Sequence, residues 1–259
     1  MLTMGVDIGS TTCKAAIISD GKEVIAKGLV AVGTGTRGPM QVYREVLDQA
    51  GLSRDAIARV VATGYGRLNF VEAERELSEV SCHGMGMHFL CPKARTIIDI
   101  GGQDAKALLL NERGNLDNFI MNDKCAAGTG RFLEAMAKIL DIRVEDMGET
   151  AERAQNPVSI SSTCAVFAES EVISRLSSGE KMEDILAGIH ASIARKVSGL
   201  AIRVGCQPPV AMSGGVAKNK GIVAALEKEL KCNITVPTDC QLAGAIGAAL
   251  FAYQDMQKK

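Results

Sequence analysis

The sequence predicts an α/β protein of two lobes that repeat one β-β-β-α-β-α unit. Asp7–Ala15 has the sequence D-I-G-S-T-T-C-K-A and Asp99–Ala107 has D-I-G-G-Q-D-A-K-A, so the pattern D-I-G-x-x-x-x-K-A occurs twice. Each copy stands between two apolar, strand-like runs, and a repeated motif of this kind indicates two similar half-folds. The third observation is that predicted strands and helices follow in the same order around each copy.

The elements of the first unit follow from apolar periodicity and turn residues. The first strands are joined by tight turns, of which Ser19–Lys22 contains Gly21 between polar residues. A helix is expected from Pro39, because proline suits the first helical turn, and it carries Val42, Val46 and Leu47 on one face. We therefore expect strands at 3–8, 13–19, 22–31 and 60–63, a turn at Gly64–Gly66 and a second helix at 72–90.

The second unit repeats that order. Strands are expected at 95–100, 105–110 and 116–121, with a turn at Asn111–Asn115 and helices after them. A duplicated β-β-β-α-β-α order is the ribonuclease H-like architecture of two-lobed actin-like ATPases and sugar kinases, which hold a nucleotide in the cleft between the lobes. We place lobe I at 1–93, with the C-terminal helix 241–259 returning to it, and lobe II at 94–240.

Composition argues against several other classes of protein. A net charge of −1 and 3% aromatic residues give neither a basic footprint nor a stacking platform for nucleic acid. The longest apolar stretch, around 244–253, is too short to span a bilayer, and Met1 is followed almost at once by the first strand, so we expect no signal peptide. Eight cysteines without a C-x-x-C pair indicate a reducing cytoplasm rather than a disulfide scaffold.

The two D-I-G turns are the predicted phosphate site. Asp7 and Asp99 end strands, where a carboxylate can hold hydrated Mg²⁺, and glycine lets backbone N–H groups approach phosphate oxygens. Gln103 and Asp104 either orient the water that attacks the γ-phosphate or simply close their turn. Lys14 and Lys106 are either phosphate ligands or solvated strand residues, and Lys14 is preferred as the ligand. The candidate nucleotide ligands in the two turns are Gly9, Ser10, Thr11, Thr12, Cys13, Lys14, Gly101 and Gly102.

Gly214 and Gly215 form a third glycine element, which follows the apolar run Pro209–Met212 and precedes a predicted helix. In actin-like ATPases, a Gly-Gly turn at this point in the order lets the backbone lie flat against adenine and ribose, where a Cβ would collide. The alternative is a plain turn between the strand and the helix. By contrast, the G-x-G-x-x-G pattern at 33–38 follows three strands rather than the first strand of a β-α-β unit, so we interpret it as a structured loop. The candidate nucleotide ligands are Gly214, Gly215 and Ala217, with Gln241 lining the same cleft; the small residues at 243–249 are expected to serve helix packing.

Two of the cysteines stand in settings suited to a metal. Cys125 and Cys164 each precede a predicted amphipathic helix, whose N-terminus stabilises a thiolate and any anionic cluster it binds. Gly128 and Thr129, close to Cys125, are further candidate cofactor-binding residues. The apolar faces of the two helices are expected at Phe132, Leu133, Met136, Ile139 and Leu140, and at Val166, Phe167, Ile173 and Leu176. The other six cysteines, at 13, 82, 91, 206, 232 and 240, are interpreted as small buried hydrophobes.

The segments around these cysteines resemble the activator component of (R)-2-hydroxyacyl-CoA dehydratases, within the BadF/BadG/BcrA/BcrD ATPase family. The matching text is K-C-A-A-G-T-G-R-F from Lys124 and I-S-S-T-C-A-V-F-A-E-S-E-V-I-S from Ile160, and V-G-T-G-T at 32–36, A-T-G-Y-G-R at 62–67, D-I-G-G-Q-D at 99–104 and A-G-I-H at 187–190 extend it. The resemblance implies a homodimer with one [4Fe-4S] cluster, ligated by Cys125 and Cys164 of each chain. A cubane needs four thiolates, and a two-fold axis doubles the two in this chain. Cys13 departs from the family pattern, which has a small residue there.

The function implied by the resemblance is ATP-driven transfer of one electron. Binding and hydrolysis of ATP with Mg²⁺ to ADP would drive an electron from reduced ferredoxin or flavodoxin through the cluster to a 2-hydroxyacyl-CoA dehydratase, in the cytoplasm of an anaerobe that ferments amino acids. Two alternatives stay open: the ATPase subunit of a benzoyl-CoA-reductase-type complex, which uses the same cluster, and a small-molecule kinase of the same superfamily, which has no use for Cys125 or Cys164. No nucleic-acid or membrane partner is expected.

Overall fold

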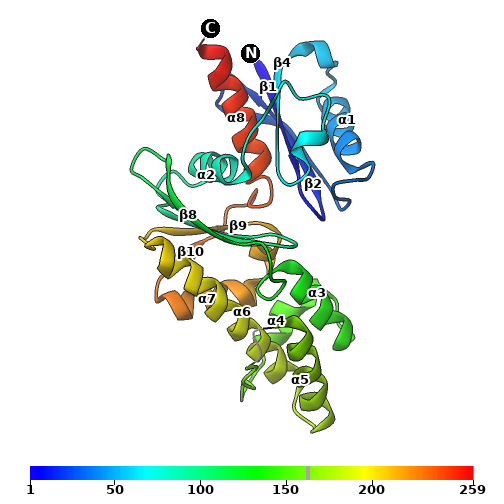
Figure 1. The fold of residues 1–259 in the computed structure, drawn as a ribbon, viewed down its shortest axis with the longest axis vertical. Coiled ribbons are helices and arrows are strands. Elements are labelled where there is room, and N and C mark those ends of the chain that lie inside the picture. Colours follow the sequence, from blue (N-terminus) through cyan, green and yellow to red (C-terminus); the bar gives the residue numbers. More distant parts are fainter. Residues whose placement is uncertain (162–163, 259) are drawn as a thin grey trace. The chain divides into compact units, whose positions relative to one another are not determined.

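The structure of the protein is a computed structural model that describes residues 1–161 and 164–258. The chain divides into two compact units, each with its own five-stranded sheet. The first unit comprises Met1–Ala94, Leu110–Asp117 and Pro237–Lys259, and the second comprises Arg95–Leu109 and Asn118–Val236. Figure 1 shows the helices and strands of each unit.

The sheet of the first unit has the strand order β3-β2-β1-β4-β5. β1 (Leu2–Ile8), β2 (Cys13–Ser19) and β3 (Glu23–Val30) form an antiparallel meander, while β4 (Ile57–Thr63) and β5 (Arg75–Glu76) add parallel strands.

Alternation along β2 shows how the sheet is covered. Ala15 and Ile17 join the apolar cluster that contains α1 (Gly38–Ala50), whereas Ala16 and Ile18 pack with α8 (Ala243–Gln257). Successive side chains of a strand point to opposite faces. α1 and α8 therefore cover opposite faces of this sheet, as Figure 1 shows.

The second sheet has the order β10-β9-β6-β7-β8, which is the same topology as the first. Its registers also match: Asp7 stands opposite Lys14 and Thr63, and Asp99 stands opposite Lys106 and Ser213. The predicted duplication is confirmed down to single residue pairs. The strands are β6 (Thr96–Ile100), β7 (Ala105–Leu110), β8 (Leu116–Asn122), β9 (Val210–Ser213) and β10 (Ile234–Thr235).

Helices fill the rest of the second unit. α6 packs against α7 and α4, and α3 contacts α5. By length and composition α6 passes a test for a membrane span, but 61% of the tested window is buried inside the protein, which is typical of a core helix. The helices are α3 (Gly130–Ile139), α4 (Met147–Ala151), α5 (Ala165–Ser177), α6 (Met182–Val204) and α7 (Lys220–Leu230).

The helix predicted at 72–90 is wrong in its first turns. α2 begins only at Glu79 and ends at Leu90. The residues before it are extended along β4: the Glu74 N–H donates to the Val60 carbonyl at 3.0 Å, and the Leu77 N–H donates to the Ala62 carbonyl at 2.9 Å. Pairing with the edge of the sheet therefore overrides the helical preference of this segment.

Small residues let α8 approach its neighbours closely, as predicted. A Cβ added at Gly86 of α2 would lie 1.9 Å from the Ala243 carbonyl oxygen, and one at Gly5 of β1 would lie 2.0 Å from the Ala245 carbonyl oxygen. A Cβ at Gly247 would lie 1.8 Å from the Cys82 carbonyl oxygen. In each case the obstacle is backbone, which cannot move aside as a side chain can.

Gly86→Ala should therefore lower the free energy of unfolding by about 1–3 kcal/mol, the range for overpacked interiors. Gly199→Ala on α6 is the matched control, because nothing lies within 4 Å of its added Cβ. The control should leave stability unchanged or raise it by up to about 1 kcal/mol, because alanine favours the helix. Denaturant unfolding followed by circular dichroism measures both variants, and equal unfolding midpoints would contradict this account of the packing.

Candidate functional site

The first D-I-G turn is closed by its own backbone and braced by a neighbouring loop. The Gly9 N–H donates to the Thr12 carbonyl at 3.1 Å, and the Thr34 N–H donates to the Gly9 carbonyl at 2.9 Å. A Cβ at Gly33 would lie 2.1 Å from the Ser10 carbonyl oxygen. The G-T-G-T-R-G segment is thus a structured loop, as predicted, and it supports the first D-I-G turn. The candidate ligands Gly9, Ser10, Thr11 and Thr12 all stay half-buried, so they can still meet a ligand.

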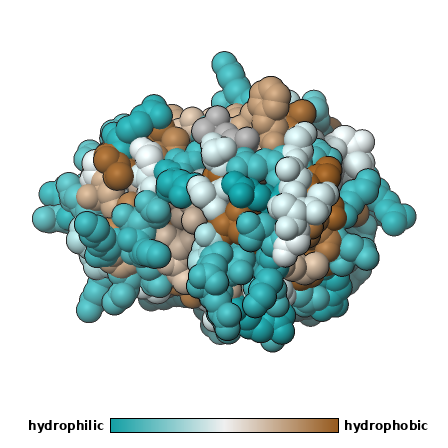
Figure 2. All heavy atoms as spheres, turned by 90° about the horizontal axis from the view of Figure 1, so that it is seen from below, coloured by the Kyte–Doolittle hydropathy of each residue, from teal (hydrophilic) through white to brown (hydrophobic). Residues whose placement is uncertain are grey.

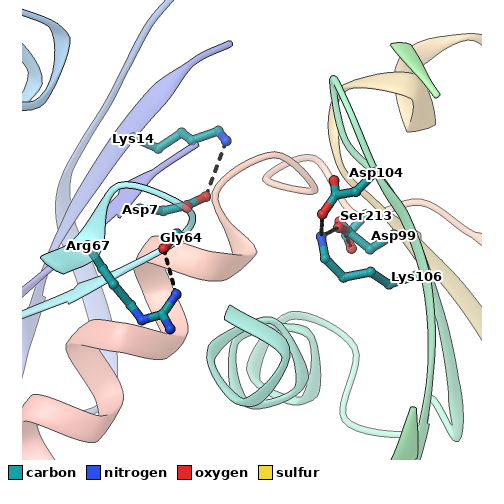
Figure 3. Close-up of polar contacts among 8 residues, drawn as sticks. All are labelled: Asp7, Lys14, Gly64, Arg67, Asp99, Asp104, Lys106 and Ser213. Carbon is teal, nitrogen blue, oxygen red and sulfur yellow. Dashed lines mark hydrogen bonds and ion pairs between the residues drawn. The ribbon is translucent and has the colours of Figure 1, made fainter. Parts of the chain in front are cut away.

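Asp7 is held tightly at the end of β1. Its carboxylate is almost fully buried and Oδ2 accepts from Lys14 Nζ at 3.2 Å (Figure 3). A Cβ at Gly64 would lie 2.5 Å from Asp7 Oδ1, and one at Gly244 would lie 2.9 Å from Asp7 Oδ2. Arg67 fixes the first of these glycines by donating to its carbonyl at 3.0 Å. Gly64 and Gly244 were not among the predicted site residues, although the A-T-G-Y-G-R text contains the first of them.

The second D-I-G turn carries a denser charge network. Lys106 Nζ lies 2.9 Å from Asp99 Oδ2 and 2.8 Å from Asp104 Oδ2, and the Ser213 hydroxyl donates to Asp99 Oδ1 at 2.7 Å (Figure 3). Lys106 is only 3% exposed, so its interpretation as a solvated strand residue is wrong. A buried ammonium needs paired charges, and the two carboxylates supply them. Ser213, the last residue of β9, was also missed.

Gln103 and Asp104 differ in what they contact. The Asp104 carbonyl accepts from the Gly101 N–H at 2.9 Å, and a Cβ at Gly101 would meet Asp104 Oδ1 at 2.5 Å. The Asp104 side chain is therefore packed over the turn and paired with Lys106. Gln103 is exposed beside Gly102, which leaves its amide accessible to a ligand or to water.

The third glycine element depends on Gly214. Its φ is +87°, a region that side chains rarely adopt, and a Cβ there would lie 2.2 Å from the Ile100 carbonyl oxygen at the end of β6. A short 3-10 turn then runs from Gly215 to Lys218 and includes the buried Ala217. Asn219 caps the N-terminus of α7, and its side chain accepts from the Ile222 N–H at 3.1 Å. This element packs directly onto the strand that carries Asp99.

Two predicted nucleotide ligands lie elsewhere than the turns. The Cys13 thiol is fully buried in the apolar cluster under α1, where burial and the nearby Asp7 carboxylate raise its pKa to about 11. Only the Cys13 backbone can therefore face a ligand. Gln241 is half-buried in the turn before α8, within the first unit.

Cys125 stands in a loop rather than at a helix end. The cysteine precedes α3, as predicted, but residues 126–129 separate it from the helix, which begins at Gly130. Lys196 of α6 donates from Nζ to Cys125 Sγ at 3.0 Å. This hydrogen bond, with the Ala127 N–H and the ammonium charge, lowers the pKa of the Cys125 thiol despite partial burial. No sequence pattern pointed to Lys196, because it lies 71 positions from Cys125 in the chain.

The Cys125 loop is tied to the second D-I-G turn. The Gly130 N–H donates to the Gly101 carbonyl at 2.9 Å, and the Arg131 N–H donates to the Gly102 carbonyl at 2.8 Å. Thr129 is fully buried and its hydroxyl donates to the Ala126 carbonyl at 2.6 Å, while Gly128 adopts a φ of +90°. The start of α3 is therefore continuous with the Cys125 loop and hydrogen-bonded to the predicted phosphate turn.

Cys164 does stand at the start of its helix, as predicted. It is exposed and occupies the N-cap position of α5, and its carbonyl accepts from the Ala168 N–H at 2.9 Å. The neighbouring Ser162 and Thr163, part of the quoted motif, lie outside the described residues. Ser161 comes before them in the chain, and its N–H and hydroxyl both donate to the carboxylate of Glu171 on α5.

The predicted buried face of α5 is wrong. Ala168 and Val172 are the buried residues of this helix, whereas Val166, Phe167 and Ile173 are 67%, 69% and 48% exposed. On the face of the second unit seen in Figure 2, apolar patches interrupt a hydrophilic surface. The reason for the misassignment is that α5 turns few residues inward and leaves its large apolar side chains beside Cys164 uncovered.

α6 fixes both cysteine-bearing segments within the second unit. The buried Asp184 accepts from the Gln155 and Asn156 N–H groups at 2.8 and 2.7 Å, and Arg195 donates to the Ile160 carbonyl at 3.1 Å. A Cβ at Gly188 would lie 1.9 Å from the Val158 carbonyl oxygen. Residues 155–160, which lead to Cys164, are thus held against the same helix that contacts Cys125 through Lys196.

The donor set of Cys125 and Cys164 suits an iron–sulfur cluster. Thiolates hold such clusters, Cys125 has an ammonium beside its sulfur, and Cys164 is exposed at a helix N-terminus. Within residues 1–161 and 164–258, no group of three or more His, Cys, Asp or Glu side chains could hold a metal ion.

Comparison with known proteins gives one family. The model of the BadF/BadG/BcrA/BcrD ATPase family matches residues 4–252. Over 258 residues, the chain is 54% identical to the 2-hydroxyisocaproyl-CoA dehydratase activator of Clostridioides difficile, covering 100% of this chain and 97% of that protein. Over 258 residues it is 53% identical to the (R)-2-hydroxyglutaryl-CoA dehydratase activating ATPase of Acidaminococcus fermentans, covering 99% and 98%.

A solved structure is equally similar. The activator of the 2-hydroxyisocaproyl-CoA dehydratase from Clostridium difficile with bound ADPNP has a TM-score of 0.96 and 53% identity, and the match covers 100% of this chain and 96% of that chain. These comparisons confirm the resemblance stated from the sequence and the two-lobed actin-like ATPase fold.

Asp99→Asn should slow MgATP hydrolysis by at least about tenfold, or ~1.4 kcal/mol in activation free energy. The substitution removes a charge paired with the buried Lys106, and Asp7→Asn should act likewise because it stands at the equivalent register. Phosphate release measures the rate. Asp117→Asn, at an exposed position on β8, is the control and should keep the parent rate. Parent rates in both the Asp99 and Asp7 variants would show that these carboxylates do not serve hydrolysis.

Proposed function

The chain belongs to the BadF/BadG/BcrA/BcrD ATPase family, and from this premise we propose that it is the ATP-driven, electron-transferring activator of a 2-hydroxyacyl-CoA dehydratase. The activator relatives align with this chain from end to end. Under the proposal the protein is a cytoplasmic homodimer that takes one electron at a time from ferredoxin or flavodoxin.

Each unit contributes a D-I-G turn to the binding of ATP and Mg²⁺. Asp7 and Asp99 hold the hydrated cation, and the half-buried Gly9, Ser10, Thr11, Thr12, Gly101 and Gly102 present backbone and hydroxyl groups to the phosphates. Gly214, Gly215 and Ala217 lie against the nucleoside, and Gln241 lines the same site. Because the Asp104 carboxylate is engaged by Lys106, we assign orientation of the attacking water to Gln103.

Cys125 and Cys164 from each of two chains hold the [4Fe-4S] cluster. When bound, the cluster supplies a one-electron redox centre that accepts from ferredoxin or flavodoxin and donates to the dehydratase. The exposed Val166, Phe167 and Ile173 support the homodimer, because they form an apolar strip next to Cys164 that a second copy would cover. Two-fold symmetry then brings four thiolates together.

The observation that carries the proposal is the pair of hydrogen bonds from the start of α3 to the Gly101 and Gly102 carbonyls. A ligand that shifts this phosphate turn also shifts the Cys125 loop, since only residues 126–129 separate the cysteine from Gly130. A tenfold change in a one-electron equilibrium corresponds to about 59 mV or ~1.4 kcal/mol. A static helix terminus contributes about 0.3–2 kcal/mol, which is below about 100 mV. A shift of the reduction potential by hundreds of millivolts therefore needs coupling to nucleotide binding and partner docking.

Cys125→Ser or Cys164→Ser should abolish the cluster while MgATP binding stays close to the parent. The reason is that both thiols supply iron ligands and neither lies in a D-I-G turn. Iron and sulfide analysis of anaerobically purified protein measures the loss. Cys91→Ser and Cys206→Ser, at half-buried positions away from both segments, are the controls and should keep the parent iron content. Full iron content in either of the first two variants would overturn the ligand assignment.

MgATP should change the rate at which a chelator removes iron from the dimer. The phosphate turn and the Cys125 loop move together, so nucleotide binding changes how accessible the iron is to a chelator. Anaerobic iron release to a chelator, followed with and without MgATP, measures the effect. Asp99→Asn with intact iron is the control and should lose most of the MgATP dependence. Identical release rates for the parent protein in both conditions would refute the coupling.

A further inference from the structure

Lys196 is a charged group in direct contact with a proposed cluster ligand. It belongs to α6, is half-buried, and donates from Nζ to Cys125 Sγ at 3.0 Å. Its aliphatic stem lies against the Cys125 loop: a Cβ at Gly128 would stand 3.4 Å from Lys196 Cδ and 3.7 Å from Cγ. The loop glycine and the lysine stem therefore fit together, and the stem directs the ammonium to the sulfur.

The rest of α6 keeps this lysine in place. Arg195, its neighbour, donates to the Ile160 carbonyl, and Val197, on its other side, is fully buried in the core. The backbone of α6 at Lys196 is thus anchored on both sides. A side chain with an anchored base and a packed stem loses less freedom on making its hydrogen bond than a free surface lysine does.

We propose that Lys196 is a positioning and tuning residue for the cluster: it holds the Cys125 sulfur in its ligating orientation and raises the cluster's reduction potential. This inference rests on the proposed function, because it presumes that Cys125 ligates iron. Hydrogen bonds to cluster sulfurs and nearby positive charge both stabilise the more negative, reduced state. In a symmetric dimer two lysines act, one on each Cys125. They set the potential from which the proposed ATP-dependent change begins.

The test compares three substitutions at this position in the anaerobically purified dimer. Lys196→Met removes both charge and donor at similar length, Lys196→Gln removes the charge but keeps an N–H donor, and Lys196→Arg keeps both. Arg203→Met is the matched control, because it removes a positive charge from an exposed position on the same helix. Reductive titration followed by absorbance and electron paramagnetic resonance gives the midpoint potential, and iron analysis gives cluster content.

We expect Lys196→Met to make the reduction equilibrium at least tenfold less favourable, which is about 59 mV more negative. Lys196→Gln should fall between it and the parent, and Lys196→Arg and Arg203→Met should stay near the parent. If Lys196→Met loses iron while its circular dichroism is unchanged, a negative shift in Lys196→Gln supports the proposal equally. The parent potential in iron-loaded Lys196→Met, or in iron-loaded Lys196→Gln where the Met variant has lost iron, overturns it.

Cys125→Ser separates this inference from the function on which it rests. A parent potential in the Lys196 variants, together with loss of iron in Cys125→Ser, rejects the role of Lys196 and leaves the cluster assignment intact. Full iron content in Cys125→Ser rejects the assignment itself, and the role of Lys196 with it.

Discussion

One helix of the second unit, α6, holds both of the segments that carry Cys125 and Cys164. Asp184, Gly188 and Arg195 hold the segment that leads to Cys164, while Lys196 holds the sulfur of Cys125. These contacts lie between the first turn of α6 and Lys196, which is a little past the middle of the helix. Because α6 is largely buried, a change that shifted it would disturb both cysteine segments at once. The helix is thus the frame against which the two proposed cluster ligands keep their places.

The two D-I-G turns of the internal repeat stand at equivalent positions in their sheets, but their surroundings differ. Asp7 and Asp99 stand at equivalent registers opposite Lys14 and Lys106. In the second unit, however, the lysine pairs with two carboxylates and is deeply buried, and the next loop donates to the turn's own carbonyls. In the first unit the turn is braced by residues 33–38 instead. The second D-I-G turn is therefore joined to the Cys125 loop, whereas the first is joined to the loop at 33–38.

Much of this arrangement could be predicted from the sequence because it is local. Alternating apolar runs and the two D-I-G turns gave the strands, their order and the fold class. The failures have a common physical cause, which is that they depend on whether segments distant in the chain make contact in the fold. Pairing with β4 keeps residues 74–77 extended, and the unpartnered face of α5 leaves Val166 and Phe167 exposed. Lys196 was missed because only the folded second unit brings it to Cys125, and burial of Lys106 depends on two carboxylates that converge on it.

Under the proposed function, two chains share one four-iron cluster through Cys125 and Cys164. Native mass spectrometry of anaerobically purified protein tests it most directly, since it counts chains and clusters in the same particle. The account predicts a species with the mass of two 27.3-kDa chains plus one [4Fe-4S] unit, with any single chains free of iron. A single chain that carries four irons, or a dimer with two clusters, would contradict it.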